Sequence, residues 1–200
     1  MSRYVLFTDL DGCLLDCDRS SFDHVRPALD SLRSARIPVI LVSGKTRAEI
    51  EPLRERLDHH DPFIVENGAA AYVPFETFDF TPERSRRRFS YHIIELGTPY
   101  ALLRDVLRQI EDAVGTPLRG FGDLTADEIM AATGLSREDA LRAMLREFDE
   151  PFLVNGPPTL IEEICRQIVA RGLNWTRGGR FFHLMGNNDE GQAAEILLRC

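Results

Sequence analysis

The sequence lacks the features that would place it in a membrane or on nucleic acid. No stretch approaches the roughly 18 apolar residues of a membrane-spanning helix, and an apolar segment begins at once where a signal sequence would stand. The formal net charge of −8 argues against general nucleic-acid binding. These absences favour a cytoplasmic protein that acts on a small molecule, with its oligomeric state left open.

Cysteine, histidine and lysine are also scarce or unpatterned. The four cysteines and five histidines show no metal-ligand or redox spacing, so we expect reduced thiols, Cys17 included. His183 stands between aromatic and apolar residues, which favours a packed side chain over a catalytic one. Lys45 is the only lysine among 24 basic residues, and we interpret the arginine bias as compositional.

The pattern of apolar segments predicts an α/β protein with two domains. At 200 residues and 44% hydrophobic composition, the chain can form one large core or two small ones. Alternating strands and helices at its start predict a doubly wound parallel sheet: strands at 3–8, 38–42 and 63–66, and helices at 24–35 and 46–57.

The pattern changes after Pro74. A charged, turn-rich link is expected at 83–88, before a second group of elements: strands at 89–96 and 180–185, and helices at 99–114, 125–133, 136–147 and 159–171. We therefore expect a first domain of residues 1–79 and 186–200, into which a second domain of residues 80–185 is inserted. A helix at 189–198 should belong to the first domain.

Two acidic residues follow the first apolar strand. Side chains at i and i+2 of an extended backbone point the same way, so Asp9 and Asp11 can face one pocket, and Gly12 lets the chain turn. In an open α/β sheet, ligands bind at this edge. Asp-x-Asp-Gly alone is equally an ordinary turn, but its place after the first strand favours a phosphoryl-transfer site.

The two carboxylates suit different tasks in that chemistry. We assign Asp9 as the nucleophile that carries the phosphoryl group as an aspartyl-phosphate. Asp11 would act as general acid and then as general base. Because both carboxylates would repel a phosphate dianion, we expect Mg²⁺ as cofactor, with Asp9 and Asp11 as its ligands.

A second polar cluster follows the next strand. Ser43 and Gly44 precede a helix that begins near Thr46, and a hydroxyl with free backbone N–H groups at a helix start can bind an anion. Lys45 adds a point charge for phosphate. Simple helix capping and a solvated lysine are the alternatives for this cluster.

Three stretches resemble the haloacid dehalogenase (HAD) superfamily of phosphatases. Residues 9–15 (Asp-Leu-Asp-Gly-Cys-Leu-Leu) resemble its motif I, residues 40–50 look like motif II, and residues 65–70 look like the turn that follows. The stretches 121–152 and 175–184 are similar to the cap domain of mannosyl-3-phosphoglycerate phosphatases. The resemblance covers essentially the whole chain.

The resemblance implies a HAD-like, Rossmann-like core with an α+β cap of the C2B type. It further implies a phosphoric monoester hydrolase that converts 2-O-mannosyl-3-phosphoglycerate to mannosylglycerate, a compatible solute. Asn67 would face the pocket from the core, while Arg177, Gly179 and Arg180 would bind the glycerate carboxylate from the cap. Without the resemblance, these cap residues are a β-turn with exposed arginines.

Two departures from the family pattern bear on activity. Glu190 occupies the position of the motif III lysine and reverses its charge. Motif IV, which supplies further carboxylates to Mg²⁺, does not occur before Cys200, so we expect a C-terminally incomplete member of the family. Another HAD sugar-phosphate phosphatase, or a degenerate HAD protein that binds a phosphorylated ligand without turnover, therefore stays open as an alternative.

Overall fold

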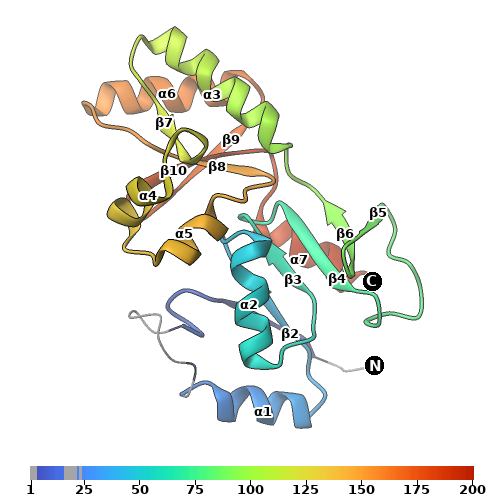
Figure 1. Ribbon diagram of the computed structural model, residues 1–200. Coiled ribbons are helices and arrows are strands. Elements are labelled where there is room, and N and C mark those ends of the chain that lie inside the picture. The colour runs from blue at the N-terminus through green and yellow to red at the C-terminus, as the bar shows by residue number, and fades with distance from the viewer. Residues whose placement is uncertain (1–3, 16–21, 23) are drawn as a thin grey trace. The chain divides into compact units, whose positions relative to one another are not determined.

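The computed structural model describes residues 4–15, 22 and 24–200, and its chain divides into two compact units (Figure 1). Unit 1 comprises residues 1–95 and 189–200, and unit 2 comprises Leu96–Asn188. The predicted strand start at Arg3 and the predicted thiol of Cys17 lie outside the described residues.

Unit 1 is built on three parallel strands, as the sequence predicted. β1 (Leu6–Asp9) pairs with β2 (Val39–Val42), which pairs with β3 (Phe63–Val65). The register places Asp9 beside Val42 and Val42 beside Ile64. Because parallel strands end at the same edge of a sheet, the residues that follow these strands gather there.

The described part of unit 1 contains the helices α1 (Arg26–Ser34), α2 (Arg47–Leu57) and α7 (Glu190–Leu198). The start of α2 is fixed by a capping box, in which Thr46 and Glu49 satisfy each other's backbone N–H groups. The helix ends at Asp58, which adopts the left-handed conformation common at helix C-termini. This capping fixes where the loop after β2 stops and α2 begins.

The sheet of unit 1 continues with antiparallel strands. β4 (Ala70–Pro74) pairs with β3, β6 (Tyr91–Glu95) pairs with β4, and β5 (Ser85–Arg88) forms the edge. The sequence predicted β6 but missed β4, and it read β5 as a link because its residues are polar. Charged residues are common on edge strands, where they discourage pairing with other chains. These pairings group residues 80–95 with unit 1.

Unit 2 contains a four-stranded antiparallel sheet in the order β7-β8-β10-β9. Its strands are β7 (Arg119–Gly120), β8 (Asp149–Leu153), β9 (Asn174–Gly178) and β10 (Phe181–Met185). Its helices are α3 (Tyr100–Val114), the 3-10 helix η1 (Phe121–Asp123), α4 (Ala126–Thr133), α5 (Arg137–Ala143) and α6 (Pro158–Ala170).

Each face of this sheet carries its own apolar cluster. Phe152 and Phe182 pack with α3 and α6, which lie side by side in Figure 1. Phe181 packs with Phe121 and the apolar side chains of α4 and α5. Phe181 and Phe182 are neighbours on one strand and so point to opposite faces, which places the two helix pairs on opposite sides of the sheet.

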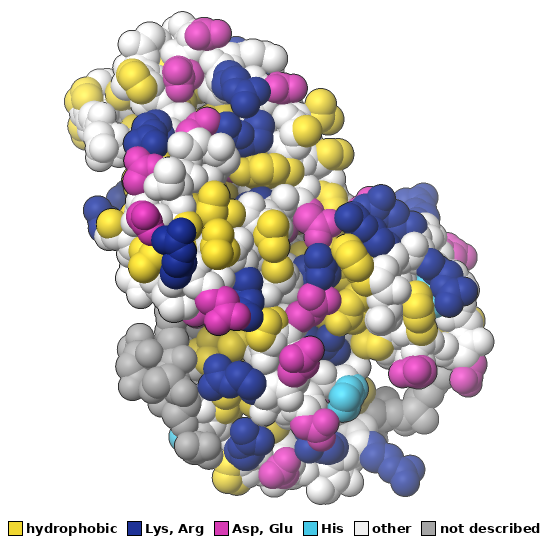
Figure 2. Space-filling model, viewed as in Figure 1, with side chains coloured by type: hydrophobic (Ala, Val, Ile, Leu, Met, Phe, Trp, Pro, Cys, Tyr) yellow, Lys and Arg dark blue, Asp and Glu magenta, His cyan; other side chains and the backbone are white. Residues whose placement is uncertain are grey.

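Within residues 4–15, 22 and 24–200, no helix has both the length and the apolar character needed to cross a bilayer. On the visible face in Figure 2, basic and acidic side chains are interspersed in both units. Exposed basic and acidic side chains also pair within single helices, such as Arg33 with Asp30 on α1 and Arg142 with Glu138 on α5. Exposed pairs of this kind contribute little to stability, at most about 1 kcal/mol each.

Candidate functional site

The first part of the site lies at the carboxyl end of β1. Asp9 closes the strand, and its Oδ1 accepts a hydrogen bond of 3.2 Å from the backbone N–H of Asp11. Both aspartates are exposed. Gly12 has a φ of +77°, a left-handed conformation that glycine adopts without strain. The turn therefore places both aspartates at this sheet edge, with the Asp9 carboxylate bonded to the backbone of Asp11.

The loops after β2 and β3 are hydrogen-bonded to each other. The backbone N–H of Asn67 donates to the carbonyl of Ser43 at 3.3 Å, and that of Glu66 donates to the carbonyl of Lys45 at 3.0 Å. A Cβ on Gly44 would lie 3.0 Å from Oδ1 of Asn67, so the Asn67 side chain covers this glycine. The structure thus brings together Ser43, Gly44, Lys45 and Asn67.

Lys45 connects this pair of loops to the aspartates. Its Nζ donates to Oδ2 of Asp11 at 2.6 Å, and the lysine side chain is only 14% exposed. The Oγ of Ser43, a buried residue, accepts the backbone N–H of Lys45 at 3.2 Å. The only lysine of the chain is therefore held in contact with the second aspartate of the site.

The start of α7 packs against the turn that follows β3. A Cβ on Gly68 would lie 2.2 Å from the carbonyl carbon of Asp189 and 2.4 Å from the backbone nitrogen of Glu190. Asp189 caps the helix by accepting the N–H of Gln192 at 2.9 Å. Only glycine fits at position 68, so the first residues of α7 are fixed at the edge where β3 ends.

Glu190 is close enough to Asp9 for their charges to interact. Partial burial, and then the negative charges of Asp9 and Asp189, raise the pKa of the Glu190 carboxyl above its ordinary value. The side chain still reaches solvent. A third acid therefore lies near Asp9, at the position that the family resemblance implied for Glu190.

The donors at this edge fit a hard cation. Among the described residues there is no group of three or more Asp, Glu, His or Cys side chains suited to a metal ion. Mg²⁺ does not need such a cage, because it often binds one or two carboxylates and completes its shell with water and substrate phosphate. The side chain of Asp9 and the oxygens of Asp11 supply this kind of donor set.

The two arginines of unit 2 that were predicted to bind the substrate contact different neighbours. The guanidinium of Arg177 lies 5.2 Å from the ring centre of Phe182, and Nη1 of Arg180 donates to the carbonyl of Ala132 at 3.3 Å. Gly179 has a φ of +57° in the turn between β9 and β10. The structure therefore gives the two arginines contacts with different parts of unit 2.

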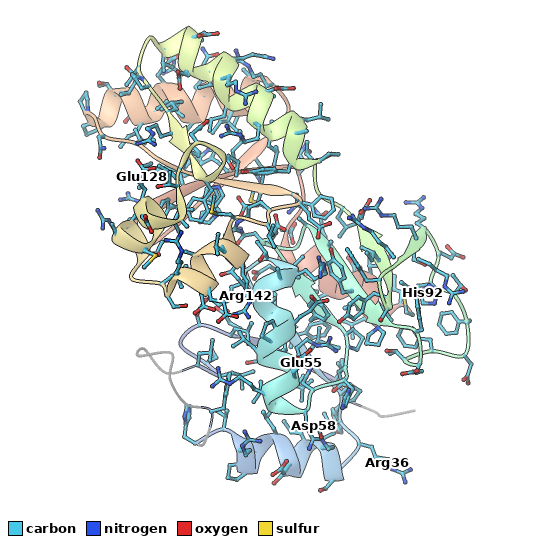
Figure 3. All side chains as sticks on the ribbon, in the orientation of Figure 1. Arg36, Glu55, Asp58, His92, Glu128 and Arg142 are labelled. Carbon is cyan, nitrogen blue, oxygen red and sulfur yellow. The ribbon has the colours of Figure 1, made fainter. Side chains whose placement is uncertain are left out.

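Unit 2 also contains a buried charged network that the sequence did not indicate. Arg104 contacts both oxygens of Asp123 and Oε1 of Glu150, at 2.5 to 2.7 Å. Its hydrogen bonds lower the pKa of the Asp123 carboxyl, while burial raises that of Glu150. On the surface, Arg119 pairs with Glu128, which Figure 3 labels on α4. The network joins α3, η1 and β8.

A second missed group pairs an acid with a histidine. Oδ2 of Asp149, a fully buried side chain, lies 2.8 Å from Nδ1 of His183 and 3.5 Å from Nη1 of Arg146. His183 is mostly buried, in line with its predicted packing, but it also has this polar partner. The apolar neighbours of His183 in the sequence gave no sign of an acid 34 residues away.

Comparison with known proteins places the chain in one family. The family model described as haloacid dehalogenase-like hydrolase matches residues 6–84. The chain is 42% identical to the glucosyl-3-phosphoglycerate/mannosyl-3-phosphoglycerate phosphatase of Methanococcoides burtonii, covering 98% of this chain and 72% of that protein. It is 34% identical to the mannosyl-3-phosphoglycerate phosphatase of Pyrococcus furiosus, covering 97% and 76%.

A solved structure has the same fold. A haloacid dehalogenase-like hydrolase from Bacteroides thetaiotaomicron superposes with a TM-score of 0.66 at 14% sequence identity, over 98% of this chain and 76% of that one. At this identity the likeness concerns the fold alone. Together with the sequence relatives, it confirms the predicted fold class, and the chain belongs to the haloacid dehalogenase-like hydrolases.

Proposed function

We propose that the protein is a phosphatase that hydrolyses 2-O-mannosyl-3-phosphoglycerate to mannosylglycerate and phosphate. The observation that carries this proposal is the meeting of Asp9, Asp11, Ser43 and Lys45 at one sheet edge. The names of the two sequence relatives supply the substrate. Glucosyl-3-phosphoglycerate is a second substrate of the same class, since the name of the first relative includes it.

The reaction proceeds through two displacements. A carboxylate oxygen of Asp9 attacks phosphorus and the bond to the glycerate oxygen breaks, while Asp11 gives that oxygen its proton. Asp11 then removes a proton from water, which attacks the aspartyl-phosphate and releases inorganic phosphate. The Asp11 backbone N–H, bonded to Oδ1 of Asp9, orients the nucleophile.

The phosphate group is held by the loop after β2. Ser43, Gly44 and Lys45 donate hydrogen bonds to its oxygens from hydroxyl, backbone and ammonium groups. Mg²⁺, held by the Asp9 side chain and the backbone carbonyl of Asp11, would neutralise charge between the Asp9 carboxylate and the phosphate. The ammonium group of Lys45 offsets part of the negative charge of Asp11 and the phosphate.

Unit 2, Leu96–Asn188, is the cap domain of this proposal, whereas the sequence predicted a cap of residues 80–185. Arg177, Gly179 and Arg180 bind the glycerate carboxylate, and Asn67 contacts the substrate from unit 1. The protein acts on this small molecule in the cytoplasm.

A second function is supported by Glu190. Its carboxylate adds negative charge beside Asp9, at the position where the family resemblance implies a lysine. Charge that develops during phosphoryl transfer is then left without that lysine, which slows turnover and favours a protein that binds a phosphorylated ligand without hydrolysing it.

Phosphate release separates the two functions. The full chain is assayed with mannosyl-3-phosphoglycerate and Mg²⁺, beside Asp9→Asn and the exposed control Asp30→Asn on α1. Release by the wild type and the control, with none from Asp9→Asn, supports the phosphatase. Ligand binding by calorimetry without any release supports the binding protein.

A further inference from the structure

The strand β5, at the edge of the sheet in unit 1, has no role in the proposed reaction. It pairs only with β6, so its other side is unpaired among the described strands. Three of its residues, Arg86, Arg87 and Arg88, are exposed, and Arg84 precedes them. Figure 2 shows basic side chains gathered where Figure 1 places β5 and β6. These four arginines and the free edge of the strand are called the β5 patch below.

The arginines of the β5 patch lie on both faces of the strand. Because side chains alternate along a strand, Arg87 points to one face, and Arg86 and Arg88 point to the other. The guanidinium of Arg87 lies 4.3 Å from the ring centre of Phe75. That of Arg88 lies 4.7 Å from the ring centre of Phe89. A guanidinium over an aromatic ring keeps N–H donors along its edges, so both faces can receive an anion.

Two of these arginines lack an acidic partner within the described part of the chain. The helices α1, α3 and α6 each contain an exposed arginine that pairs with an acid three residues away. In the β5 patch, Arg86 pairs with Glu95. Neither Arg84 nor Arg87 has an ion pair there, and Arg87 has only its aromatic neighbour. The patch therefore carries positive charge that no described acid contacts.

A free strand edge with arginines on both faces suits an acidic, extended peptide. The unpaired backbone groups of β5 can form a ladder with an added strand, whose side chains would alternate to both faces. A second copy of β5 would place arginine opposite arginine, which is destabilising. A nucleic acid would leave the backbone groups of β5 unpaired, and the net charge of −8 would repel it. The arginines thus discourage other strands but favour an acidic one.

We propose that the β5 patch binds an acidic segment of a partner protein, which adds as a further strand to the edge of the unit 1 sheet. The backbone of β5 supplies the hydrogen bonds that hold the segment, and the arginines select its acidic side chains. Binding at this edge involves unit 1 alone and is independent of phosphate release.

The binding test uses a fluorescein-labelled peptide of alternating glutamate and valine, titrated with the full chain and followed by fluorescence anisotropy. We expect saturable binding that Arg87→Glu weakens roughly three- to thirtyfold, because it replaces a favourable cross-strand charge pair by a repulsive one. Arg56→Glu is the matched control. Arg56 is also exposed and lies 4.7 Å from the ring centre of Phe22, but it belongs to α2. The same change in net charge there should alter the affinity by less than about twofold.

Two further probes separate strand addition from attraction between charges alone. A peptide of alternating glutamate and proline keeps the carboxylates but cannot pair as a strand. Single-stranded polyuridylate carries its negative charge on a phosphate backbone. Both should bind roughly tenfold more weakly than the glutamate–valine peptide, because the backbone hydrogen bonds are missing. Equal affinity for either probe, equal binding by Arg87→Glu and Arg56→Glu, or no saturable binding of the glutamate–valine peptide overturns the proposal.

Amide hydrogen exchange tests the backbone pairing directly. When the glutamate–valine peptide is bound, the β5 amides that face the free edge should exchange more slowly, while exchange in α1 should stay the same. Peptide binding with unchanged exchange in β5 would rule out strand addition.

Discussion

Replacing Lys45 by methionine tests whether the single lysine serves the phosphate site. The Lys45 Nζ lies 2.6 Å from Oδ2 of Asp11, a separation at which two unit charges attract by about 1.6 kcal/mol in bulk water. The Asp11 side chain is 46% exposed, so the effective value stays near that limit. In contact with a phosphate oxygen, the ammonium would add a charged hydrogen bond of about 1.5–3 kcal/mol.

These magnitudes predict a loss in catalysis without a loss in stability. We expect Lys45→Met to lower kcat/KM for phosphate release by roughly 10- to 150-fold. The free energy of unfolding should change by less than about 1 kcal/mol, because the pair is partly exposed. Lys45→Arg keeps the charge and should retain more activity than the methionine variant.

Arg47→Met is the matched control for this variant. Arg47 also lies at the start of α2, pairs with an acid at 2.6 Å through Glu51, and has a similarly covered side chain, 17% exposed. Arg47 is the first residue of α2, and its side chain pairs with Glu51 on the helix and not with Asp11, so its loss should change kcat/KM less than twofold. If Lys45→Met and Arg47→Met show the same kcat/KM, Lys45 has no special role at the site.

Five further variants, at Glu190, Gly68, Gly12 and His59, test the charge at the site, the packing of α7 and the pH dependence of stability. Glu190→Gln and Glu190→Lys should bind inorganic phosphate progressively more tightly, by roughly three- to tenfold per unit of charge. If the product-inhibition constant of the lysine variant is no lower than that of the wild type, the charge of Glu190 does not affect phosphate binding. Gly68→Ala should lower the free energy of unfolding in urea by about 2–5 kcal/mol, because backbone strain in the left-handed conformation adds to steric overlap with the start of α7. Gly12→Ala, with a φ of +77° and no described atom within 4 Å of the added methyl, should lower it by only about 1–2 kcal/mol. Equal losses in the two variants would refute the packing argument. Burial lowers the pKa of His59 below its ordinary 6.5, so the unfolded chain takes up that proton at a higher pH than the folded chain. The free energy of unfolding should therefore decrease as the pH is lowered below about 6.5, by at most ~1.4 kcal/mol per pH unit. An equally steep decrease in His59→Gln would assign this pH dependence to other groups.

The strands could be predicted where every residue is apolar. β2 and β3 consist entirely of buried apolar residues, and both strands were predicted from this pattern. β5 and β9 were missed because they are mostly polar edge strands, whose pairing cannot be read from their own residues. β8 begins with Asp149 and Glu150, and the partners that make their burial tolerable lie far away in the sequence.

The parts of the site that depend on local sequence patterns could likewise be predicted. The predicted positions of Asp9, Asp11 and Ser43 needed only the ends of two adjacent parallel strands, which sequence patterns reveal. The contact between Lys45 and Asp11 could not be predicted, because it depends on a side-chain conformation across 34 residues. The family resemblance, in turn, singled out position 190, where the sequence alone shows only an acid at a helix start.

The most direct test of the central claim is to isolate the phosphorylated enzyme. Asp11→Asn slows the removal of the phosphoryl group by water, because no general base then activates the water. Because Asp11 also protonates the leaving glycerate oxygen, the variant is mixed with Mg²⁺ and p-nitrophenyl phosphate, whose leaving group needs no proton, and is then quenched rapidly with acid. Mass spectrometry of the peptide that contains Asp9 should find one added phosphoryl group, and Asp9→Asn should show none. Phosphate release in the first turnover by wild type and Asp9→Asn alike, with the peptide unmodified, would contradict the account.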